Sequence, residues 1–486
     1  MNKISCFLPY AGKEQVEKTV NSLQATGLIE EIRLITTDAT LESLPDCEIL
    51  FVDMPYSSAT LKAIANAAKG EYTLLYTKET TLEMGMFALE RMIHILEDSS
   101  AGMVYADHYQ IADGKQSNAP VIDYQFGSLR DDFNFGSLLL FNTEKLKEAA
   151  GHMKSDYNFA GLYDLRLKLS QHSNLVHINE YLYSEVENDT RKSGEKIFDY
   201  VDPKNRDRQI EMEQACTEHL KEIGGYLAPE FKKIEFSAGN FEYEASVIIP
   251  VRNRIRTIRD AIKSVLMQKT DFKYNLIIID NHSTDGTTEA IDEFKDDERL
   301  IHIVPERNDL GIGGCWNVGV HHPKCGKFAV QLDSDDVYKD ENTLAIMVRA
   351  FYEQNCAMVV GTYMMTDFNM NMIAPGIIDH KEWTPANGRN NALRINGLGA
   401  PRAFYTPVLR EVKVPNTSYG EDYALGLNFS RKYQIGRVYD VVYLCRRWDD
   451  NSDASLDIVK MNGHNLYKDR IRTWELQARI AMNKNK

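Results

Sequence analysis

The sequence has no hydrophobic run that could cross a membrane as a helix, because no stretch approaches the roughly 20 apolar residues that such a helix needs. Its first residues, MNKISCFLPYAG, contain an apolar stretch too short and too polar for a secretory signal. Cysteine is scarce, and the seven residues are scattered without a CxxC pair. Such a set argues against a disulfide framework or a thiolate zinc site and indicates reduced thiols. We therefore expect a cytoplasmic protein.

Positively charged residues are fewer than negatively charged ones. Lys and Arg number 56 against 71 Asp and Glu, so the formal net charge is -15. This balance argues against a general nucleic-acid binder, whereas a bound metal, or an anion held through a metal, is compatible with it. The composition, 43% hydrophobic and 26% charged, is typical of a globular protein. A chain of 486 residues is long enough for about two or three domains.

What the chain does contain is an internal repeat. Segments from its two halves share an apolar strand, a proline, a polar turn and an amphipathic helix, followed by further strands in the same order. The paired segments are 3–23 with 244–265, 69–83 with 325–340, and 161–170 with 419–430. Alternating strands and helices predict an α/β protein with two tandem domains, each with a mostly parallel, open sheet.

The pattern also predicts where the domains end. We expect a first domain over residues 1–204, a helix and linker over 205–242, a second domain over 243–455 and a C-terminal helical tail over 456–486. The linker helix is charged and stops at a Gly-Gly pair, which is a common helix terminator.

An acidic cluster follows one apolar strand of the second copy. The stretch KFAVQLDSDDVYKDEN (327–342) runs an apolar segment directly into Asp333, Asp335 and Asp336. Carboxylates this close repel one another and are costly to desolvate unless a cation holds them. Oxygen ligands of this kind suit Mg²⁺ or Mn²⁺. The alternative is a solvated acidic turn.

Five stretches of the second copy carry a family resemblance. In order they are SVIIPVRNR, IIIDNHSTDGT, NDLGIGGCWNVGV, VQLDSDD and SYGEDYALGLNFSRK. Together they resemble the inverting family 2 glycosyltransferases of the GT-A fold, over residues 243–453. The resemblance implies a GT-A domain that transfers a sugar from a nucleotide-sugar donor, with UDP favoured, to a glycan or lipid-linked acceptor. It also implies a role in surface polysaccharide synthesis.

The same resemblance implies roles on the donor side. Asp335 would bind Mn²⁺ or Mg²⁺, and Asp333 would contact the ribose or the metal's water, so both belong to the implied metal site. The implied contacts to the nucleotide and the sugar donor come from turns and strand ends. They are Pro250, Asn253, Asp280 and Asn317. A lone Asp at a strand end is otherwise often a helix cap.

On the acceptor side the resemblance implies a general base. Asp422 matches that base, which takes the proton of the attacking hydroxyl, and Glu421 would orient it. A favourable helix N-terminus is the structural alternative. Arg447 and Trp448 match a pair that contacts acceptor or diphosphate, and Trp448 could equally belong to the core. The polar segment 387–405 stands where the family keeps a mobile acceptor loop, although an ordinary surface loop is an alternative.

The first copy is not equivalent. Thr77, Lys78 and Glu79 stand opposite Asp333, Ser334 and Asp335, so a lysine replaces part of the acidic pattern. We expect a degenerate copy without a metal site, serving as scaffolding, as an acceptor-binding module or as a homo-oligomer interface.

Two rival functions stay open at this point. In one, the first copy is a second, metal-independent transferase of a two-site glycan polymerase. In the other, the whole chain binds nucleotide sugars or carbohydrates without turnover.

The tail is the one basic segment. Residues 458–486 carry seven Lys or Arg against two acids. Such a helix gains about 1 kcal/mol per well-placed cation at an anionic membrane surface, which would place the protein peripherally at the inner membrane face. Its apolar residues only loosely form one face, so a helix packed on its own domain is the alternative.

Overall fold

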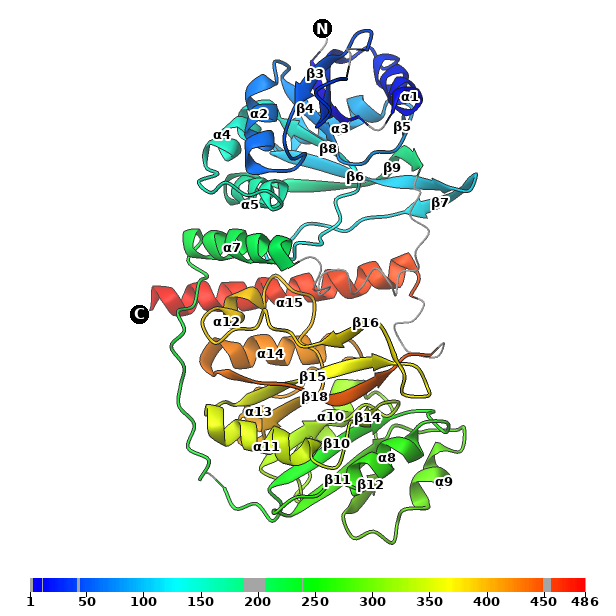
Figure 1. The fold of residues 1–486 in the computed structure, drawn as a ribbon, viewed down its shortest axis with the longest axis vertical. Helices are drawn as coiled ribbons and strands as arrows, with labels where there is room; N and C mark the ends of the chain where they lie inside the picture. Colours follow the sequence, from blue (N-terminus) through cyan, green and yellow to red (C-terminus); the bar gives the residue numbers. More distant parts are fainter. Residues whose placement is uncertain are drawn as a thin grey trace. The chain divides into compact units, whose positions relative to one another are not determined.

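The computed structural model describes residues 3–10, 12–41, 44–186, 206–237, 239–448 and 456–485 (Figure 1). The chain forms two compact units, one made of Met1–Tyr226 with Leu456–Lys486 and the other of Leu227–Ser455. The boundary predicted between 204 and 205 lies outside the described residues, as do 449–455 at the end of the predicted second domain.

The first unit is an α/β domain built on one sheet. Its strands are β1 (Ile4–Pro9), β2 (Ile29–Thr36), β3 (Glu48–Phe51), β4 (Tyr72–Tyr76), β5 (Leu82–Met84), β6 (Met103–Ala112), β7 (Lys115–Ala119), β8 (Leu138–Asn142) and β9 (Leu175–Val186). Its helices are α1 (Lys13–Gln24), α2 (Ser58–Ala67), α3 (Ala88–Asp98), α4 (Thr143–Gly151), α5 (Gly161–His172), α7 (Arg206–Glu222) and α15 (Ile458–Lys484).

The second unit has the same architecture. Its strands are β10 (Ala245–Val251), β11 (Tyr274–Asp280), β12 (Leu300–Ile303), β13 (Phe328–Gln331), β14 (Val337–Tyr338), β15 (Met358–Thr366), β16 (Met372–Ile378), β17 (Arg402–Tyr405) and β18 (Ile435–Arg446). Its helices are α8 (Ile258–Leu266), α9 (Thr287–Asp292), α10 (Ile312–His321), α11 (Thr343–Gln354), α12 (Gly388–Asn391), α13 (Thr406–Val412) and α14 (Glu421–Lys432).

The two sheets match strand for strand. The first has the order β3-β2-β1-β4-β8-β6-β9-β5 with β7 on β6, and the second has β12-β11-β10-β13-β17-β15-β18-β14 with β16 on β15. In both, the first four strands of this order pair in parallel, and β8 and its counterpart β17 pair antiparallel with both neighbours. The predicted α/β class with two tandem, similar domains is therefore confirmed.

Strand β1 shows how the sequence builds each sheet. Its side chains alternate between two faces, as a strand requires. Cys6 and Leu8 join a core cluster that includes residues of α1 and α3, whereas Phe7 joins a second cluster with residues of α2 and α4. Helices therefore cover both faces of the sheet, and ligand access is left to the strand ends.

The structure assigns two helices to a different part of the chain than the predicted domain bounds do. Helix α7, expected in a linker, and α15, expected as a separate tail, both belong to the first unit. The Asp469 carboxylate of α15 accepts a hydrogen bond from Ser128 Oγ at 3.1 Å, and Thr473 Oγ1 accepts one from the Gly127 amide at 2.9 Å. The helix therefore packs on the segment between β7 and β8.

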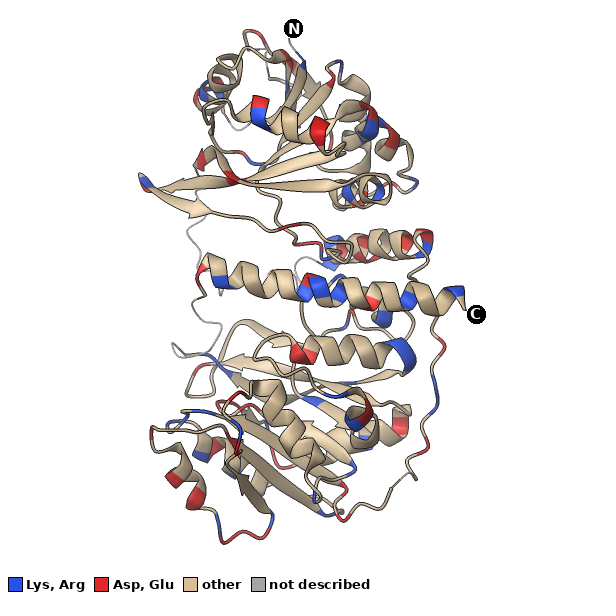
Figure 2. Ribbon diagram, turned by 180° about the vertical axis from the view of Figure 1, so that it is seen from behind, with Lys and Arg blue, Asp and Glu red and all other residues tan. Residues whose placement is uncertain are grey.

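The charge of α15 is mixed along its length. Figure 2 shows acidic residues between its Lys and Arg residues. Arg472 and Arg479 are fully buried, and each pairs with an acid of the same helix, at 2.8 Å and 2.7 Å respectively. Among the described residues, no helix combines the length and the apolarity needed to cross a membrane.

Candidate active site

The predicted acidic turn and the start of α14 open into one cavity of the second unit. The cavity has a volume of about 310 Å³ and lies at the carboxyl end of β13, where parallel α/β sheets bind ligands. It is lined by Pro250, Arg254, Ile312, Trp316, Gln331, Asp333, Ser334, Asp335, Asp336, Arg402, Phe404, Val414, Glu421, Asp422, Leu425, Cys445 and Arg447. Four of the predicted site residues, Asp333, Asp335, Glu421 and Asp422, are thus brought together although about 90 residues separate the pairs.

The acidic turn concentrates negative charge directly after the buried strand β13. Desolvation, together with the neighbouring Asp335, raises the pKa of Asp333, while Arg402 opposes that shift. Desolvation, followed by the charges of Asp335 and Asp333, raises the pKa of Asp336 well above its usual range. The turn therefore holds more negative charge than its protein surroundings neutralise.

This turn fits a divalent ion that is shared with a substrate. Among the described residues, no group of three or more His, Cys, Asp or Glu side chains has the geometry of a metal site. Mg²⁺ and Mn²⁺ need fewer protein ligands than that, because one or two carboxylates suffice when water and phosphate oxygens complete the shell. Asp333 and Asp335 supply hard oxygen ligands, and a cation between them would offset both the desolvation and the repulsion by Asp335 that raise the pKa of Asp333.

Two arginines flank the turn. Arg446 is fully buried; its backbone amide donates to Asp336 Oδ1 at 2.8 Å and its Nε donates to the Asp335 carbonyl at 2.5 Å. Arg254 Nε lies 3.8 Å from Asp335 Oδ2. Arg446 therefore fixes the backbone of the turn, and Arg254 places a positive charge beside the carboxylate predicted to bind metal.

Asp422, the predicted base, is paired with an arginine that the sequence did not single out. Arg402 Nη1 lies 2.7 Å from Asp422 Oδ2, and the two side chains are only 14% and 26% exposed. Asp422 Oδ1 accepts a hydrogen bond from the Tyr423 amide at 2.7 Å, at the first turn of α14. The arginine and the helix N-terminus both favour the ionised carboxylate and fix its orientation.

Glu421 behaves differently although it is the adjacent residue. Desolvation and the neighbouring Asp422 raise the pKa of Glu421 to about 8, despite the opposing charge of Arg402. Near neutral pH its carboxyl is largely protonated in the absence of a ligand. The environment of Glu421 therefore favours its protonated form, as the environment of an acid group in an active site often does.

A short hydrogen-bonded path joins the acidic turn to Arg402. Gln331, the last residue of β13, donates from Nε2 to Asp333 Oδ1 at 2.8 Å and accepts from the Arg402 amide at 3.1 Å. The Asp333 amide donates to Tyr443 Oη at 3.1 Å. This path fixes the predicted metal ligand and the partner of the predicted base relative to each other.

The predicted donor contacts are only partly at the cavity. Pro250 lines it, whereas Asn253, Asp280 and Asn317 are not among its lining residues. Asn253 adopts a left-handed conformation (φ 54°), and its Oδ1 accepts from the Thr284 amide at 2.8 Å. Asn253 therefore connects the turn after β10 with the turn after β11.

Asp280 is fully buried, with both carboxylate oxygens engaged. Oδ1 accepts from the Ser283 amide at 3.0 Å, and Oδ2 accepts from Thr288 Oγ1 at 2.5 Å. Although burial opposes ionisation, the nearby His302 and these hydrogen bonds hold the pKa of Asp280 below its usual range. In this geometry Asp280 organises the turn after β11.

Asn317 secures a loop to α10. Its Nδ2 donates to the Val414 carbonyl at 2.7 Å, and its Oδ1 accepts from the Val414 amide at 3.0 Å. A Cβ on Gly313 of the same helix would lie 1.8 Å from the Pro415 carbonyl oxygen. The glycines here permit close approach of the chain's own 414–418 segment, which leads directly into Glu421.

Arg447 and Trp448 continue from β18 at the rim of the site. Arg447 lines the cavity, and its amide donates to the Thr366 carbonyl at 2.8 Å. The Trp448 ring stacks edge-on with Phe368, with centroids 5.5 Å apart, and lies 4.9 Å from the Arg256 guanidinium. Trp448 therefore contacts Phe368 and Arg256 of its own unit.

The equivalent place in the first unit is neutralised internally. Lys78 Nζ lies 2.6 Å from Glu185 Oε1, and His108 Nε2 lies 3.1 Å from the same oxygen. Although burial opposes ionisation, His108 and Lys78 lower the pKa of Glu185 to about 2. A lysine ammonium therefore supplies the positive charge beside Glu185 at this place.

Comparisons with known proteins agree with this geometry. Residues 246–403 match the family model described as glycosyl transferase family 2. An uncharacterized glycosyltransferase of Rickettsia conorii is 39% identical over 196 residues, which is 40% of this chain and 31% of the relative. The putative teichuronic acid biosynthesis glycosyltransferase TuaG of Bacillus subtilis is 29% identical over 126 residues, 26% of this chain and 49% of the relative.

Each match covers only a part of this chain and a part of the protein it is compared with. The chain spans about a third of the length of the first curated relatives it matches. The solved structure of S. aureus TarS 1-349 in complex with UDP-GlcNAc aligns with a TM-score of 0.38 and 18% identity, covering 49% of this chain and 72% of that one. The family match falls on the unit that contains the acidic turn and the β17 arginine. The family match therefore covers residues 246–403 of the second unit, which is similar to glycosyl transferase family 2 over that stretch.

Proposed function

We propose that the second unit transfers a sugar, with inversion, from a nucleotide-sugar donor to a hydroxyl group of a glycan or lipid-linked acceptor. The observation that carries this proposal is that Asp333, Asp335 and Asp422 line one cavity. An inverting transfer needs charge neutralisation on the leaving side and a base on the attacking side, and this cavity offers both.

On the donor side, Asp335 and Asp333 would hold Mn²⁺ or Mg²⁺, and the ion would supply positive charge for the diphosphate leaving group. Arg254, 3.8 Å from Asp335, and Arg447 on the cavity wall add positive charge for the diphosphate. Pro250 bounds the cavity beside them. A UDP-sugar is the proposed donor.

On the acceptor side, Asp422 accepts the proton of the attacking hydroxyl. Its ion pair with Arg402, 2.7 Å long, orients the carboxylate toward the cavity side of α14 and stabilises its negative charge. Glu421, largely protonated, donates a hydrogen bond rather than competing as the base. Surface polysaccharide assembly is the proposed setting, supported by the name of TuaG.

The test is release of nucleoside diphosphate from a panel of UDP-, GDP- and dTDP-sugars with Mn²⁺ and a mixture of glycan acceptors. We expect turnover with one donor, its loss in EDTA and in Asp335→Ala, and retained donor binding in Asp422→Asn. Full activity in EDTA would refute the metal role. Donor binding without turnover, for every acceptor offered, would favour the non-catalytic alternative.

A further inference from the structure

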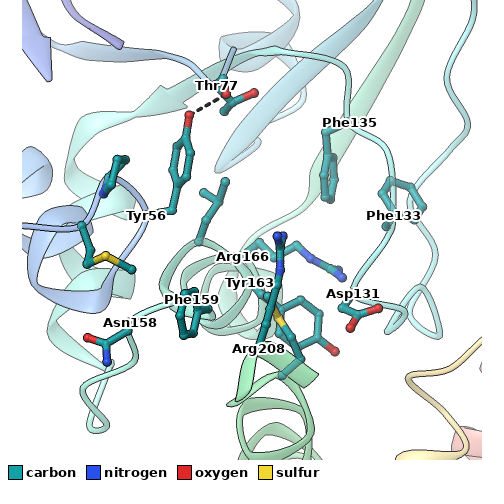
Figure 3. A pocket seen from close by; sticks show the side chains of 14 residues that line it. Tyr56, Thr77, Asp131, Phe133, Phe135, Asn158, Phe159, Tyr163, Arg166 and Arg208 are labelled. Carbon is teal, nitrogen blue, oxygen red and sulfur yellow. Dashed lines mark hydrogen bonds between the residues drawn. The ribbon is translucent and has the colours of Figure 1, made fainter. Parts of the chain in front are cut away.

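The first unit contains a cavity of its own that the proposed transfer does not use. It has a volume of about 330 Å³ and lies between the turn before α2, the end of β4, the segment before β8, α5 and α7 (Figure 3). That volume is at the lower end of the range of about 300–1,000 Å³ that is usual for small-molecule sites. All of its lining residues belong to the first unit.

Its position corresponds to that of the candidate active site in the second unit. Thr77 lines this cavity. It lies as many residues after the first paired residue of β4 as Asp333 lies after the first paired residue of β13. Tyr163, on its wall, stands opposite Glu421 in the aligned repeats. The repeat has therefore kept an opening at the same sheet edge while replacing two acids by a hydroxyl group and an aromatic ring.

The chemistry of the walls is that of a sugar site. Five aromatic rings surround the opening, as Figure 3 shows, and they come from the turn before α2, the segment before β8 and the start of α5: Tyr56, Phe133, Phe135, Phe159 and Tyr163. Polar groups of Asn158, Asp131 and Arg208 stand among them. A pyranose ring presents apolar C–H faces that stack on aromatic rings and equatorial hydroxyl groups that bond amides, carboxylates and guanidinium groups.

Contacts within the protein hold these rings in place without a ligand. The Arg166 guanidinium lies 4.6 Å from the Tyr163 ring and 5.5 Å from the Phe135 ring, and its Nη1 donates to the Ser128 carbonyl at 2.9 Å. Tyr56 Oη donates to the Thr77 carbonyl at 2.5 Å. The segment that carries Phe135 is further fixed by its bonds to α15. Such preorganisation lowers the entropic cost of binding a ligand.

One ring is not explained by core packing. Phe133, Phe135 and Tyr163 are 5–9% exposed, as core residues are, whereas Phe159 is 39% exposed at the rim. The amides of Asn158 and Phe159 donate to the Glu211 carboxylate of α7, at 3.1 Å and 2.6 Å. The Glu211 carboxylate therefore fixes the backbone of residues 158 and 159, from which the exposed Phe159 ring projects at the rim.

We propose that this cavity binds a sugar residue of a glycan, without metal and without nucleotide. A metal-bound nucleoside diphosphate is disfavoured because Thr77 replaces one acid of the acidic turn, and the charge of Lys78 is already paired with Glu185. The bound sugar belongs to the acceptor rather than to the donor, and this assignment alone rests on the proposed function of the second unit.

The experiment uses the full chain carrying Asp335→Ala, in EDTA, so that metal-dependent donor binding is absent. Saturation-transfer NMR and calorimetry are run with a panel of neutral oligosaccharides of glucose, galactose and N-acetylglucosamine. We expect saturable binding of at least one of them that added UDP does not displace. Phe159→Ala should weaken that binding about tenfold, because one stacking face is lost.

Phe126→Ala is the matched control, because Phe126 is also an exposed phenylalanine of the first unit, 45% exposed, and does not line the cavity. Equal affinity of the Phe159→Ala and Phe126→Ala proteins would overturn the proposal, as would displacement by UDP or a lack of binding across the panel. Arg208→Ala, at an exposed position, provides a second variant with the same expected loss should Phe159→Ala unfold. Sugar binding without any transferase activity would leave the cavity assigned and remove only its description as an acceptor site.

Discussion

Replacing Arg402 by leucine tests the acceptor side of the candidate site most directly. Leucine is a suitable replacement because Leu139 occupies the equivalent position of β8 in the first unit. The substitution removes the 2.7 Å ion pair to Asp422, in which both side chains are less than a third exposed. It also leaves the carboxyl groups of Asp422, Glu421 and Asp333 without the cation that they share.

The expected cost has two parts. Removing one partner of a fully buried pair costs about 3–5 kcal/mol, and partial exposure of this pair reduces the expected loss of stability to about 1–3 kcal/mol. The base also loses its orientation and the charge that favours its ionised form, so kcat/KM should fall on the order of 10²-fold. The acidic limb of the pH–rate profile should move to higher pH, since no opposite charge favours the carboxylate.

The assay combines thermal unfolding with nucleoside diphosphate release from pH 5 to 9. Arg402→Lys is the matched variant, because it keeps the charge and loses the planar guanidinium, and it should recover part of the lost rate. Arg307→Leu is the surface control, since Arg307 pairs with Asp309 at 70% and 60% exposure. Wild-type kcat/KM and an unshifted acidic limb in Arg402→Leu would refute the assignment of Arg402 and Asp422 as a functional pair.

Four further predictions follow from the described geometry. Asp335→Ala should fold normally and lose activity about 10²-fold or more, with weaker Mn²⁺ binding measured by calorimetry; unchanged Mn²⁺ affinity would contradict a role as metal ligand. Asp422→Asn should keep donor affinity while kcat falls; an equal loss of both would instead make it a binding residue. Gly313→Ala should destabilise the fold by about 2–4 kcal/mol, because its Cβ would lie 1.8 Å from the Pro415 carbonyl oxygen; an unchanged Tm would show that the 414–418 segment can shift freely. Glu185, with its pKa lowered from 4.5 to about 2 in the folded state, should contribute stability that is present above pH 4.5 and is lost as the pH falls toward 2; Glu185→Gln should flatten that part of the curve, measured by urea unfolding.

The sequence by itself determined the repeat, the α/β class and the most acidic part of the site. Strand periodicity and the proline-to-helix pattern are local properties, so two copies with the same order of elements could be recognised without any contact information. The acidic turn was predictable for the same reason, because an apolar strand that ends in three acids is contiguous in the chain. The start of α14 was found through its resemblance to the family 2 pattern.

Only the tertiary structure decided which side chains act on one another. Arg402 meets Asp422 and Gln331 through pairing of β17 with β13, a register that no local pattern encodes. Likewise Asp280 and Asn317 match the family pattern by position, but their hydrogen bonds to neighbouring turns depend on how those turns pack.

The same reason applies to the first unit. Its C-terminal helix returns to it across more than 200 residues of the second unit, and its aromatic cavity collects rings from three separate stretches of the chain. Long-range packing of this kind depends on the shapes and charges of surfaces that exist only after the local elements have formed, so spacing along the chain cannot predict it.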